Sequence, residues 1–385
     1  MQDFVHLHVH TYYSILDGQS SIQKLVDKAV ADGMRGMAIT DHGDMFGIKE
    51  FWDYCAGVNS KRKKEGLEPF KPILGCEMYV AHHNKEDRAG KEDRSGYHLI
   101  VLAKNYLGYK NLIKLVSNSW TDGFYMRPRT DRADLERHHE GLIVCSACIA
   151  GEVPSKVLKG DIEGAREAVQ WYKRVFGDDY YLELQRHEVK DPSIRANRET
   201  YPLQQRANSV LMQLAREYGV KIVCTNDAHF VDQENAEAHD HLLCLSTGKD
   251  LDDPTRMLYS KQEWFKTRAE MNEVFGDLPE AMANTLEVLD KVELYSIEHS
   301  PIMPFFPIPE SFGTEEQWRG QFPQGQLFFG VYREEDGQNP LPREEGEKKI
   351  EKLGGYDKLY RIKFEADYLA KLAYEGARKL YGDPP

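Results

Sequence analysis

Apolar residues follow two alternating patterns along the chain between residue 4 and about residue 250. Short apolar runs occur at 4–9 and 36–40, and between them the apolar positions from 22 to 30 recur at the spacing of one helix face. Gly33 follows this helical pattern and is suited to end the helix. A strand, a helix and a second strand in this order predict a βαβ unit.

The same alternation continues along the chain. We predict strands at 72–80, 97–103, 141–145, 180–184 and 221–224, and helices at 47–64, after Asn105, and at 151–159, 161–176, 203–218, 260–275 and 279–292. Ser260 and Glu263 have the spacing of a capping box at the start of one of these helices. Strands separated by helices favour a parallel sheet, so we predict an α/β fold with a closed or distorted barrel.

The pattern changes after residue 298. The segment 299–312 carries prolines at positions that exclude a helix or a central strand, and it is predicted to be an extended connector. Residues 313–355 are rich in Gly, Gln, Glu and Pro and predict a loosely ordered insertion, whereas 363–380 is again helical. We therefore expect a main domain at 1–298, a connector with an insertion at 299–362, and the start of a further segment at 363–385.

The composition is that of an ordinary globular protein. The 385 residues are 41% apolar and 29% charged, and no apolar run approaches the roughly 20 residues of a membrane span. The first residues lack the basic and apolar regions of a secretory signal, so we expect a cytoplasmic protein without a membrane partner.

Charge and cysteine content narrow the range of functions that the chain can have. The net charge of −13 disfavours non-specific binding of nucleic acid, although bound divalent cations could still capture a phosphodiester locally. The six cysteines are scattered, and only Cys145 and Cys148 form a CxxC pair. A second pair is missing, so we expect reduced thiols and neither a zinc ribbon nor a redox motif.

Histidines and carboxylates stand at the predicted strand ends. His6, His8 and His10 alternate along the first predicted strand and would share one face, the alternative being a polar face open to solvent. His42 follows the second strand, and Glu77 interrupts an apolar run in the third. A buried carboxylate of this kind needs a partner.

These residues are expected to meet at one mouth of the barrel, because the carboxyl ends of parallel strands open on the same side. The predicted cluster contains His8, His10, His42, Glu77, Asp227 and His229. Mixed imidazole and carboxylate ligands suit Zn, Mn or Fe, and this many ligands imply two or more ions. Adjacent ions at such a site favour hydrolysis of a phosphoester.

The sequence lacks the motifs that identify several other enzyme classes. The sequence contains no GxxxxGK[ST] loop, no GxGxxG after a strand, no HExxH and no GxSxG elbow. Nucleoside triphosphatases, dinucleotide-dependent dehydrogenases, zincin proteases and serine esterases are therefore disfavoured.

Several motifs resemble a known family. HLHVHT, TDHG, GCE, YHLIVLAKN and TNDAHF resemble the PHP (polymerase and histidinol phosphatase) family of metal-dependent phosphoesterases. The longer segments FVHLHVHTYYSILDG, GFYMRPRTDRADLERHHEGLI and SPIMPFFPIPE are similar to the N-terminal part of the bacterial DNA polymerase III alpha subunit family. The resemblance covers nearly the whole chain except about 313–355.

The resemblance implies a PHP-type distorted (β/α)7 barrel with a trinuclear site at the strand ends, holding three divalent ions (Zn, Mn or Fe). The family's ligands, which would act in catalysis through bound metals, fall on His8, His10, Asp17, His42, Glu77, His98, Cys148, Asp227 and His229. By resemblance, His8, His10, Glu77 and Asp227 surround one ion, Glu77, His98 and Cys148 a second, and Asp17, His42 and His229 a third. His6 would orient a ligand rather than bind metal.

The resemblance also implies a role in DNA replication, with a DNA-directed DNA polymerase as the parent protein. The expected activity is metal-dependent 3′ to 5′ exonuclease proofreading on a DNA 3′ end. A palm motif with clustered aspartates is absent from the sequence, so we expect a fragment that cannot polymerise DNA. Palm, thumb and fingers domains would be its partners, and residues 363–385 would lead into the palm.

Two alternatives remain open. The domain could be a metal-stabilised, non-catalytic scaffold that docks the polymerase and a separate proofreading exonuclease subunit. It could also be a free-standing phosphatase of the histidinol phosphatase type, although the polymerase-like segment from Ser300 onward argues against this.

Overall fold

The computed structural model describes residues 2–189, 195, 199–302, 304–324 and 342–383. Contacts divide the chain into two units, residues 1–298 and residues 299–385. Among the described residues, no helix has both the length and the apolar content that a membrane span requires.

The first unit is built on a curled, seven-stranded mixed sheet. Its order along the main path is β1-β2-β3-β5-β6-β7, and the short β4 pairs with β2. The strands are β1 (Gly36–Ile39), β2 (Lys71–Val80), β3 (Tyr97–Ala103), β4 (Arg129–Thr130), β5 (Leu142–Cys145), β6 (Tyr180–Gln185) and β7 (Lys221–Thr225). The predicted α/β class with a distorted barrel is confirmed.

The sheet is less parallel than the alternation of strands and helices predicts. β3 runs antiparallel to both of its neighbours, β2 and β5, whereas the other pairs are parallel. The connection between β2 and β3 contains only a short 3-10 turn, η1 (Glu92–Arg94), and no crossover helix. Without a crossover, β3 returns beside β2 in the opposite direction.

The N-terminal segment joins the two ends of the sheet. The backbone N–H of Thr40, just after β1, donates to the carbonyl of Val9 at 2.8 Å, and that of His10 donates to the carbonyl of Ala228, after β7, at 2.7 Å. Val9 forms only an isolated bridge, so the predicted strand at 4–9 is not a regular ladder strand. Its position nevertheless brings His8 and His10 inside the curl.

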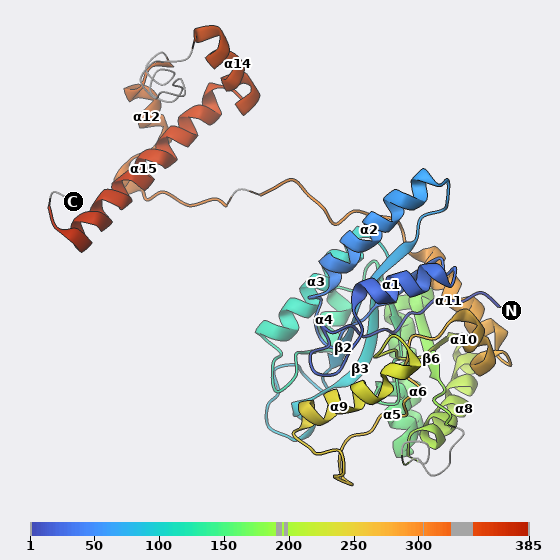
Figure 1. Cartoon of the computed structure of the whole chain (residues 1–385). Coiled ribbons are helices and arrows are strands. Elements are labelled where there is room, and N and C mark those ends of the chain that lie inside the picture. The colour runs from blue at the N-terminus through green and yellow to red at the C-terminus, as the bar shows by residue number, and fades with distance from the viewer. Residues whose placement is uncertain (1, 190–194, 196–198, 303, 325–341, 384–385) are drawn as a thin grey trace. The chain divides into compact units, whose positions relative to one another are not determined.

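Helices surround the curled sheet in the first unit (Figure 1). They are α1 (Ile22–Ala31), α2 (Ile48–Lys64), α3 (Tyr106–Thr121), α4 (Arg132–Arg137), α5 (Glu152–Lys159), α6 (Ile162–Phe176), α8 (Tyr201–Tyr218), α9 (Ala236–Thr247), α10 (Arg268–Phe275) and α11 (Pro279–Lys291). Their apolar stripes pack on the sheet; in α1, for example, Ile22, Leu25, Val26 and Ala29 are buried.

The helix predicted at 260–275 begins only at Arg268, capped by Thr267. Ser260 does hydrogen-bond Glu263, but residues 262–266 continue as extended chain. Phe230 and Trp264 form a parallel bridge there, and pairing with a distant segment overrides the local capping signal.

The second unit contains α12 (Glu315–Gln321), α14 (Arg343–Leu353) and α15 (Tyr356–Tyr381). Helices therefore occur inside the interval 313–355, where composition predicts loose order, and the predicted helix 363–380 begins earlier, at Tyr356. Ile350, Leu359 and Tyr360 form its small buried cluster. The part of the predicted insertion at 325–341 lies outside the described residues.

Candidate metal centre

Glu77 lies at the centre of a cluster of imidazoles. Its Oε1 is 2.7 Å from Nδ1 of His98 and 3.4 Å from Nε2 of His8, and its Oε2 is 2.7 Å from Nδ1 of His42 and 3.4 Å from Nε2 of His10. The side chain of Glu77 is only 1% exposed. Its place in β2 explains the contacts, because Tyr79 pairs with His98 across the antiparallel ladder and His42 bridges to Glu77.

Asp227 closes the cluster from the segment after β7. Its Oδ1 lies 3.1 Å from Nε2 of His8 and 3.2 Å from Nε2 of His10, and 3.5 Å from Nδ1 of His229. The backbone of Asp227 has a φ of 49°, a left-handed conformation that is uncommon outside glycine. Such local strain is often found where a side chain must be aimed at a functional site.

Asp17 approaches from the loop after the N-terminal segment. Its Oδ2 lies 2.9 Å from Nε2 of His42 and 3.8 Å from Nε2 of His229. Gly18 is needed beside it, because a Cβ there would stand 2.0 Å from the carbonyl oxygen of Thr11. The hydroxyl of Tyr259 lies 3.4 Å from Oδ2 of Asp17.

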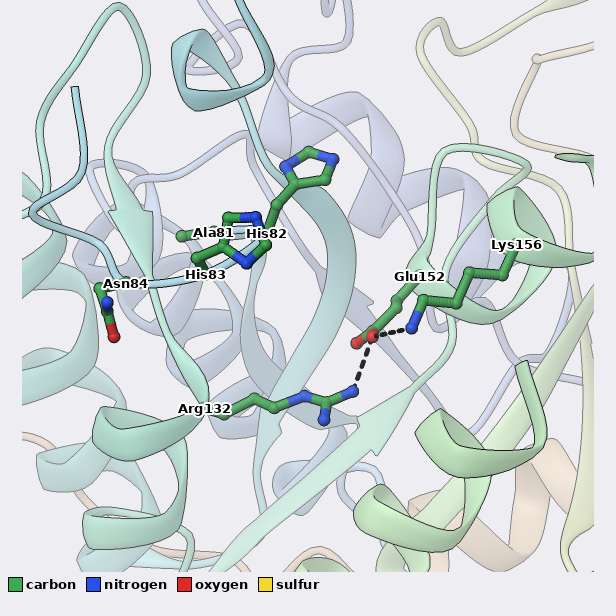
Figure 2. A pocket seen from close by; sticks show the side chains of 7 residues that line it. All are labelled: Ala81, His82, His83, Asn84, Arg132, Glu152 and Lys156. Carbon is green, nitrogen blue, oxygen red and sulfur yellow. Dashed lines mark hydrogen bonds and ion pairs between the residues drawn. The ribbon is translucent and has the colours of Figure 1, made fainter. Parts of the chain in front are cut away.

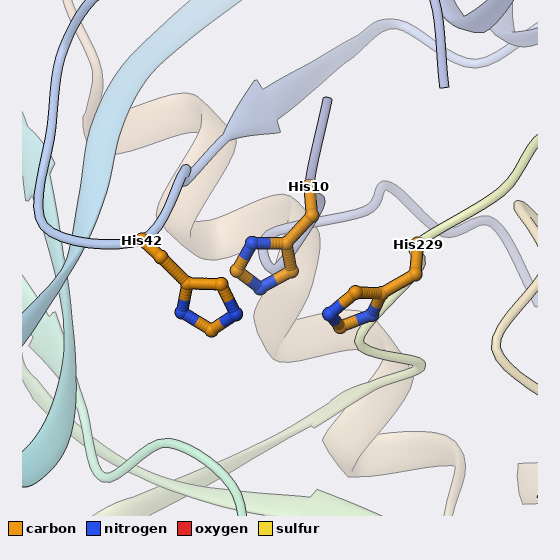
Figure 3. A group of neighbouring side chains, drawn as sticks. All are labelled: His10, His42 and His229. Atoms are coloured by element: carbon orange, nitrogen blue, oxygen red, sulfur yellow. The ribbon is translucent and has the colours of Figure 1, made fainter. Parts of the chain in front are cut away.

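The donor atoms form overlapping groups that could each hold an ion. Within each group, one ligand atom per residue lies within 4.8 Å of the others; among the described residues the groups are His10–His42–His229, His8–His10–Asp227 and His42–Glu77–His98. The rings of the first group come from three separate loops and lie side by side (Figure 3). The His10 ring lies 4.1 Å from that of His42 and 4.2 Å from that of His229.

The ionisation of His10 and Glu77 favours metal binding, whereas the neighbouring carboxylates outweigh burial and raise the pKa of His8 and His42, which must lose a proton before they bind an ion. Burial, together with the nearby His42 and His229, lowers the pKa of His10 to about 3, so its imidazole is neutral at pH 7. Burial alone would raise the pKa of Glu77, but the charges of His98 and His42 outweigh it and hold the pKa well below its ordinary value. Neutral imidazole and ionised carboxylate are the forms that ligate metals.

Several buried atoms of the cluster make no hydrogen bond within the described part of the chain. They are Nε2 of His8, Nε2 of His10, Oδ1 of Asp17, Nδ1 of His42, Oε2 of Glu77 and Oδ1 of Asp227. A buried polar atom that makes no hydrogen bond costs about 1–3 kcal/mol, and most of these atoms face one another at 2.7 to 3.4 Å. Divalent ions suit these donor types and would satisfy the atoms that lack hydrogen bonds.

Residues behind the cluster orient two of its histidines. Nδ1 of His8 lies 2.7 Å from Oε1 of Glu183, which also accepts a 2.5 Å hydrogen bond from the hydroxyl of Thr225. Nδ1 of His10 lies 2.9 Å from the hydroxyl of Ser14, which donates to Asp41. Both contacts leave Nε2 facing the cluster, as in many metal sites.

Sequence reasoning missed Glu183, although its signal was the one that identified Glu77: a carboxylate inside an apolar strand. It also predicted that His6 orients a ligand, and this is wrong, because Nε2 of His6 contacts the carbonyl of Lys266 at 2.7 Å and its ring packs on Phe265. Cys148 belongs to none of the groups above; its Sγ lies 3.8 Å from Nδ1 of His98. Cys145 is buried in β5.

Figure 2 shows the residues that line a polar cavity of about 400 Å³, and Gly151, which precedes the lining residue Glu152, bridges to His98. The cavity is lined by Ala81, His82, His83, Asn84, Arg132, Glu152 and Lys156. The carboxylate of Glu152 lies 2.6 Å from Arg132 and 3.1 Å from Lys156. Both cations are thus already paired with a buried carboxylate.

The PHP domain family matches residues 6–187, an interval that contains most of the cluster. This part of the chain belongs to the PHP domain family. Comparison with curated proteins gives a more specific match than the domain family. The chain is 43% identical to DNA polymerase III subunit alpha of Borreliella burgdorferi over 317 residues. That match covers 81% of this chain and 26% of the relative.

Other alpha subunits give the same picture. The chain is 38% identical to DNA polymerase III subunit alpha of Treponema pallidum, covering 82% of this chain and 25% of that one, and 36% identical to that of Thermus aquaticus, covering 86% and 26%. The chain therefore spans about a quarter of the length of these relatives.

Likeness to solved structures is weak. Histidinol phosphate phosphatase from Lactococcus lactis is 12% identical, with a TM-score of 0.29; the match covers 64% of this chain and 95% of that one. A score this low does not establish a shared fold.

Proposed function

We propose that this PHP domain binds divalent ions and hydrolyses phosphodiesters at the 3′ end of DNA, as the proofreading part of a cytoplasmic DNA polymerase III alpha subunit. The observation that carries the proposal is the convergence of buried imidazole and carboxylate atoms that lack hydrogen bonds. We assign three ions (Zn, Mn or Fe) to a set of nine ligands, which we call the metal centre. These ligands are His8, His10, Asp17, His42, Glu77, His98, Cys148, Asp227 and His229.

Ions held by such donors lower the pKa of a bound water and stabilise the leaving oxygen of a phosphoester. The protein supplies the geometry. Glu77 reaches four imidazoles with its two oxygens, and Glu183 keeps Nε2 of His8 turned toward them. Nδ1 of His229 lies 2.8 Å from the carbonyl of Asp227, which leaves its Nε2 facing Asp17.

The test is Asp227→Asn, with His10→Ala as a second variant. Each removes a donor from the centre, so we expect cleavage of a 5′-labelled single-stranded DNA to fall about 100-fold or more. Asp252→Asn changes an exposed carboxylate elsewhere and serves as the control. Cleavage should also disappear on chelation, and an unchanged rate in Asp227→Asn would contradict the proposal.

A non-catalytic scaffold is the second candidate. It is favoured by the origin of the proposed ligands, which come from the N-terminal segment, β2, β3 and the segments after β1, β5 and β7. Ions there would join distant parts of the barrel and hold a surface for the polymerase or a separate exonuclease subunit. This candidate predicts a loss of thermal stability on chelation and no cleavage of any DNA end.

A further inference from the structure

Exposed aromatic side chains gather beside the loop that follows His42. Phe46, Trp120 and Phe124, named here the aromatic platform, are 58%, 42% and 43% exposed. The Trp120 ring stacks on that of Phe124 at 5.4 Å with an interplanar angle of 17°, and it lies 6.3 Å from the ring of Phe46. A patch of exposed aromatic rings marks an interaction surface.

The platform is anchored to the metal centre through the backbone. The indole N–H of Trp120 donates to the carbonyl of Gly43 at 2.8 Å. The N–H of Gly43 donates to the carbonyl of Glu77 at 2.8 Å, and Gly43 directly follows His42. A molecule resting on the platform therefore lies beside the loop that presents His42.

A cavity of about 380 Å³ opens at the platform, between α3 and the loop before α2. It is lined by Met45, Phe46, Ile113, Val116, Ser117, Trp120 and Thr121. Its size lies in the range of small-ligand pockets, and its walls are mainly apolar with a few hydroxyl groups. Such a surface suits a flat heterocycle better than a chain of charges.

The loop that carries Phe124 also carries a cation, Arg127, close to the imidazoles. The guanidinium of Arg127 lies 5.7 Å from the centre of the Tyr79 ring, which itself lies 6.1 Å from that of His42. Arg127 is exposed, and it makes no ion pair with any residue that the structure describes. It contrasts with Arg132 and Lys156, which both pair with Glu152.

Hydrogen bonds from a buried arginine hold the loop that carries Phe124 and Arg127 in place. Arg129 is fully buried and donates to the carbonyls of Gly123, Lys85 and Asp87 at 3.1, 2.7 and 2.9 Å. The platform is therefore formed before a ligand arrives, which reduces the entropy lost on binding.

We propose that the aromatic platform and Arg127 bind an unpaired nucleotide of single-stranded DNA, with a base stacked on the rings and a phosphate against the guanidinium. Base stacking on aromatic side chains with a nearby cation is the general mode of single-strand binding. In a duplex the bases are stacked on each other, so the platform selects unpaired ends. The inference rests on the proposed function only for its purpose, which is to direct a frayed 3′ end to the metal centre.

The test measures binding in a chelator, so that no cleavage is needed. The probe is a fluorescent single-stranded DNA of about ten nucleotides, titrated with this chain and followed by anisotropy. Trp120→Ala should raise the Kd about 10-fold, within the roughly 5- to 150-fold that the loss of one stacked base causes. Tyr106→Ala, at an aromatic residue that is 45% exposed outside the platform, is the matched control and should leave the Kd unchanged.

A second variant separates stacking from the anchoring hydrogen bond. Trp120→Phe keeps a ring but loses the bond to Gly43, and it should retain most of the affinity. The proposal is overturned if Trp120→Ala binds like the unmodified chain, if Trp120→Phe loses as much as Trp120→Ala, or if a blunt duplex binds as tightly as the single strand. Loss of cleavage in Asp227→Asn with binding intact would support the metal centre separately, so the two proposals can fail independently.

Discussion

Two carboxylates sit inside otherwise apolar strands, Glu77 in β2 and Glu183 in β6, and both are buried. Their contacts indicate different roles for the two carboxylates. Glu77 contacts four imidazoles, whereas Glu183 contacts only His8 among them and is bonded from behind by Thr225 and Gln185. Glu183 therefore positions a ligand, and Glu77 is itself placed to be one.

Replacing Glu183 should weaken metal binding without removing a ligand. In Glu183→Gln the contact with Nδ1 of His8 loses its charge, which makes the imidazole a poorer donor and less firmly oriented. We expect the affinity for the first bound ion to fall about 10- to 100-fold, measured by competition with a fluorescent chelator. Glu163→Gln on the exposed surface of α6 is the control, and equal affinities in both variants would contradict the role of Glu183.

His187 should make stability depend on pH. Burial holds its pKa below the usual 6.5, and its Nε2 lies 3.1 Å from the carbonyl of Asn226. The unfolded chain takes up a proton near pH 6.5 and the folded chain does not. The stabilisation is therefore present above pH 6.5 and is lost as the pH falls below it, by up to about 1.4 kcal/mol per pH unit.

The measurement is urea denaturation between pH 7.5 and about 5. His187→Gln should flatten the decline below pH 6.5, whereas the exposed control His83→Gln should keep the slope of the unmodified chain. An unchanged slope in His187→Gln would show that other groups cause the acid sensitivity.

At the level of elements, β4 and the loops beside it depend on Arg129. Arg129→Met would leave the carbonyls of Gly123, Lys85 and Asp87 without this donor. The carbonyl of Gly123 keeps the backbone N–H of residue 129 as a donor, so the loss falls on the carbonyls of Lys85 and Asp87. We expect the free energy of unfolding to fall by at least about 2 kcal/mol, because each buried acceptor that is left unpaired costs about 1–3 kcal/mol. Denaturation curves measure the loss, and limited proteolysis should cut first at 82–88 or 123–128.

Replacement of the exposed Arg88 by Met is the control, because it removes a cation from the same loops. Within the described part of the chain, the Arg88 side chain donates a hydrogen bond to the carbonyl of Asp122 alone. Equal stability of Arg129→Met and Arg88→Met would contradict the bracing role.

Local patterns predicted most elements to within a few residues, because helix stripes and apolar runs report directly on burial; the strand 97–103 and the helix 161–176 are examples. They failed where distant pairing decides. The direction of β3 follows from a connection without a helix, and residues 262–266 are extended because they pair with Phe230. The capping-box spacing of Ser260 and Glu263 is a local signal, and it does not show that this segment pairs with Phe230.

The functional residues likewise divide into those that the sequence pattern could predict and those that depend on distant contacts. His8, His10, Glu77 and Asp227 could be predicted to meet because strand ends converge, and the structure brings them together. The platform could not be predicted in this way. Phe46 and Trp120 lie on separate elements, and only their exposure and shared contact with the loop after His42 distinguish them from core aromatics.

At the scale of the whole molecule, ions should hold the first unit together. Its proposed ligands lie between His8 and His229, whereas the described part of 299–385 contributes none. Ions at about 1,000 times their Kd add about 4 kcal/mol to stability. Chelation should therefore lower the thermal midpoint of the first unit by at least about 8 °C, measured by calorimetry beside elemental analysis of the bound metal.

Hydrogen exchange tells this effect apart from general destabilisation. Chelation should speed amide exchange in β2, β3 and β7, which lead into the metal centre, and should leave α15 unchanged because it belongs to the other unit. Removal of bound metal without a change in either the midpoint or the exchange would mean that the ions do not join these segments. Such a result, combined with metal-dependent cleavage, would favour a purely catalytic centre over the scaffold.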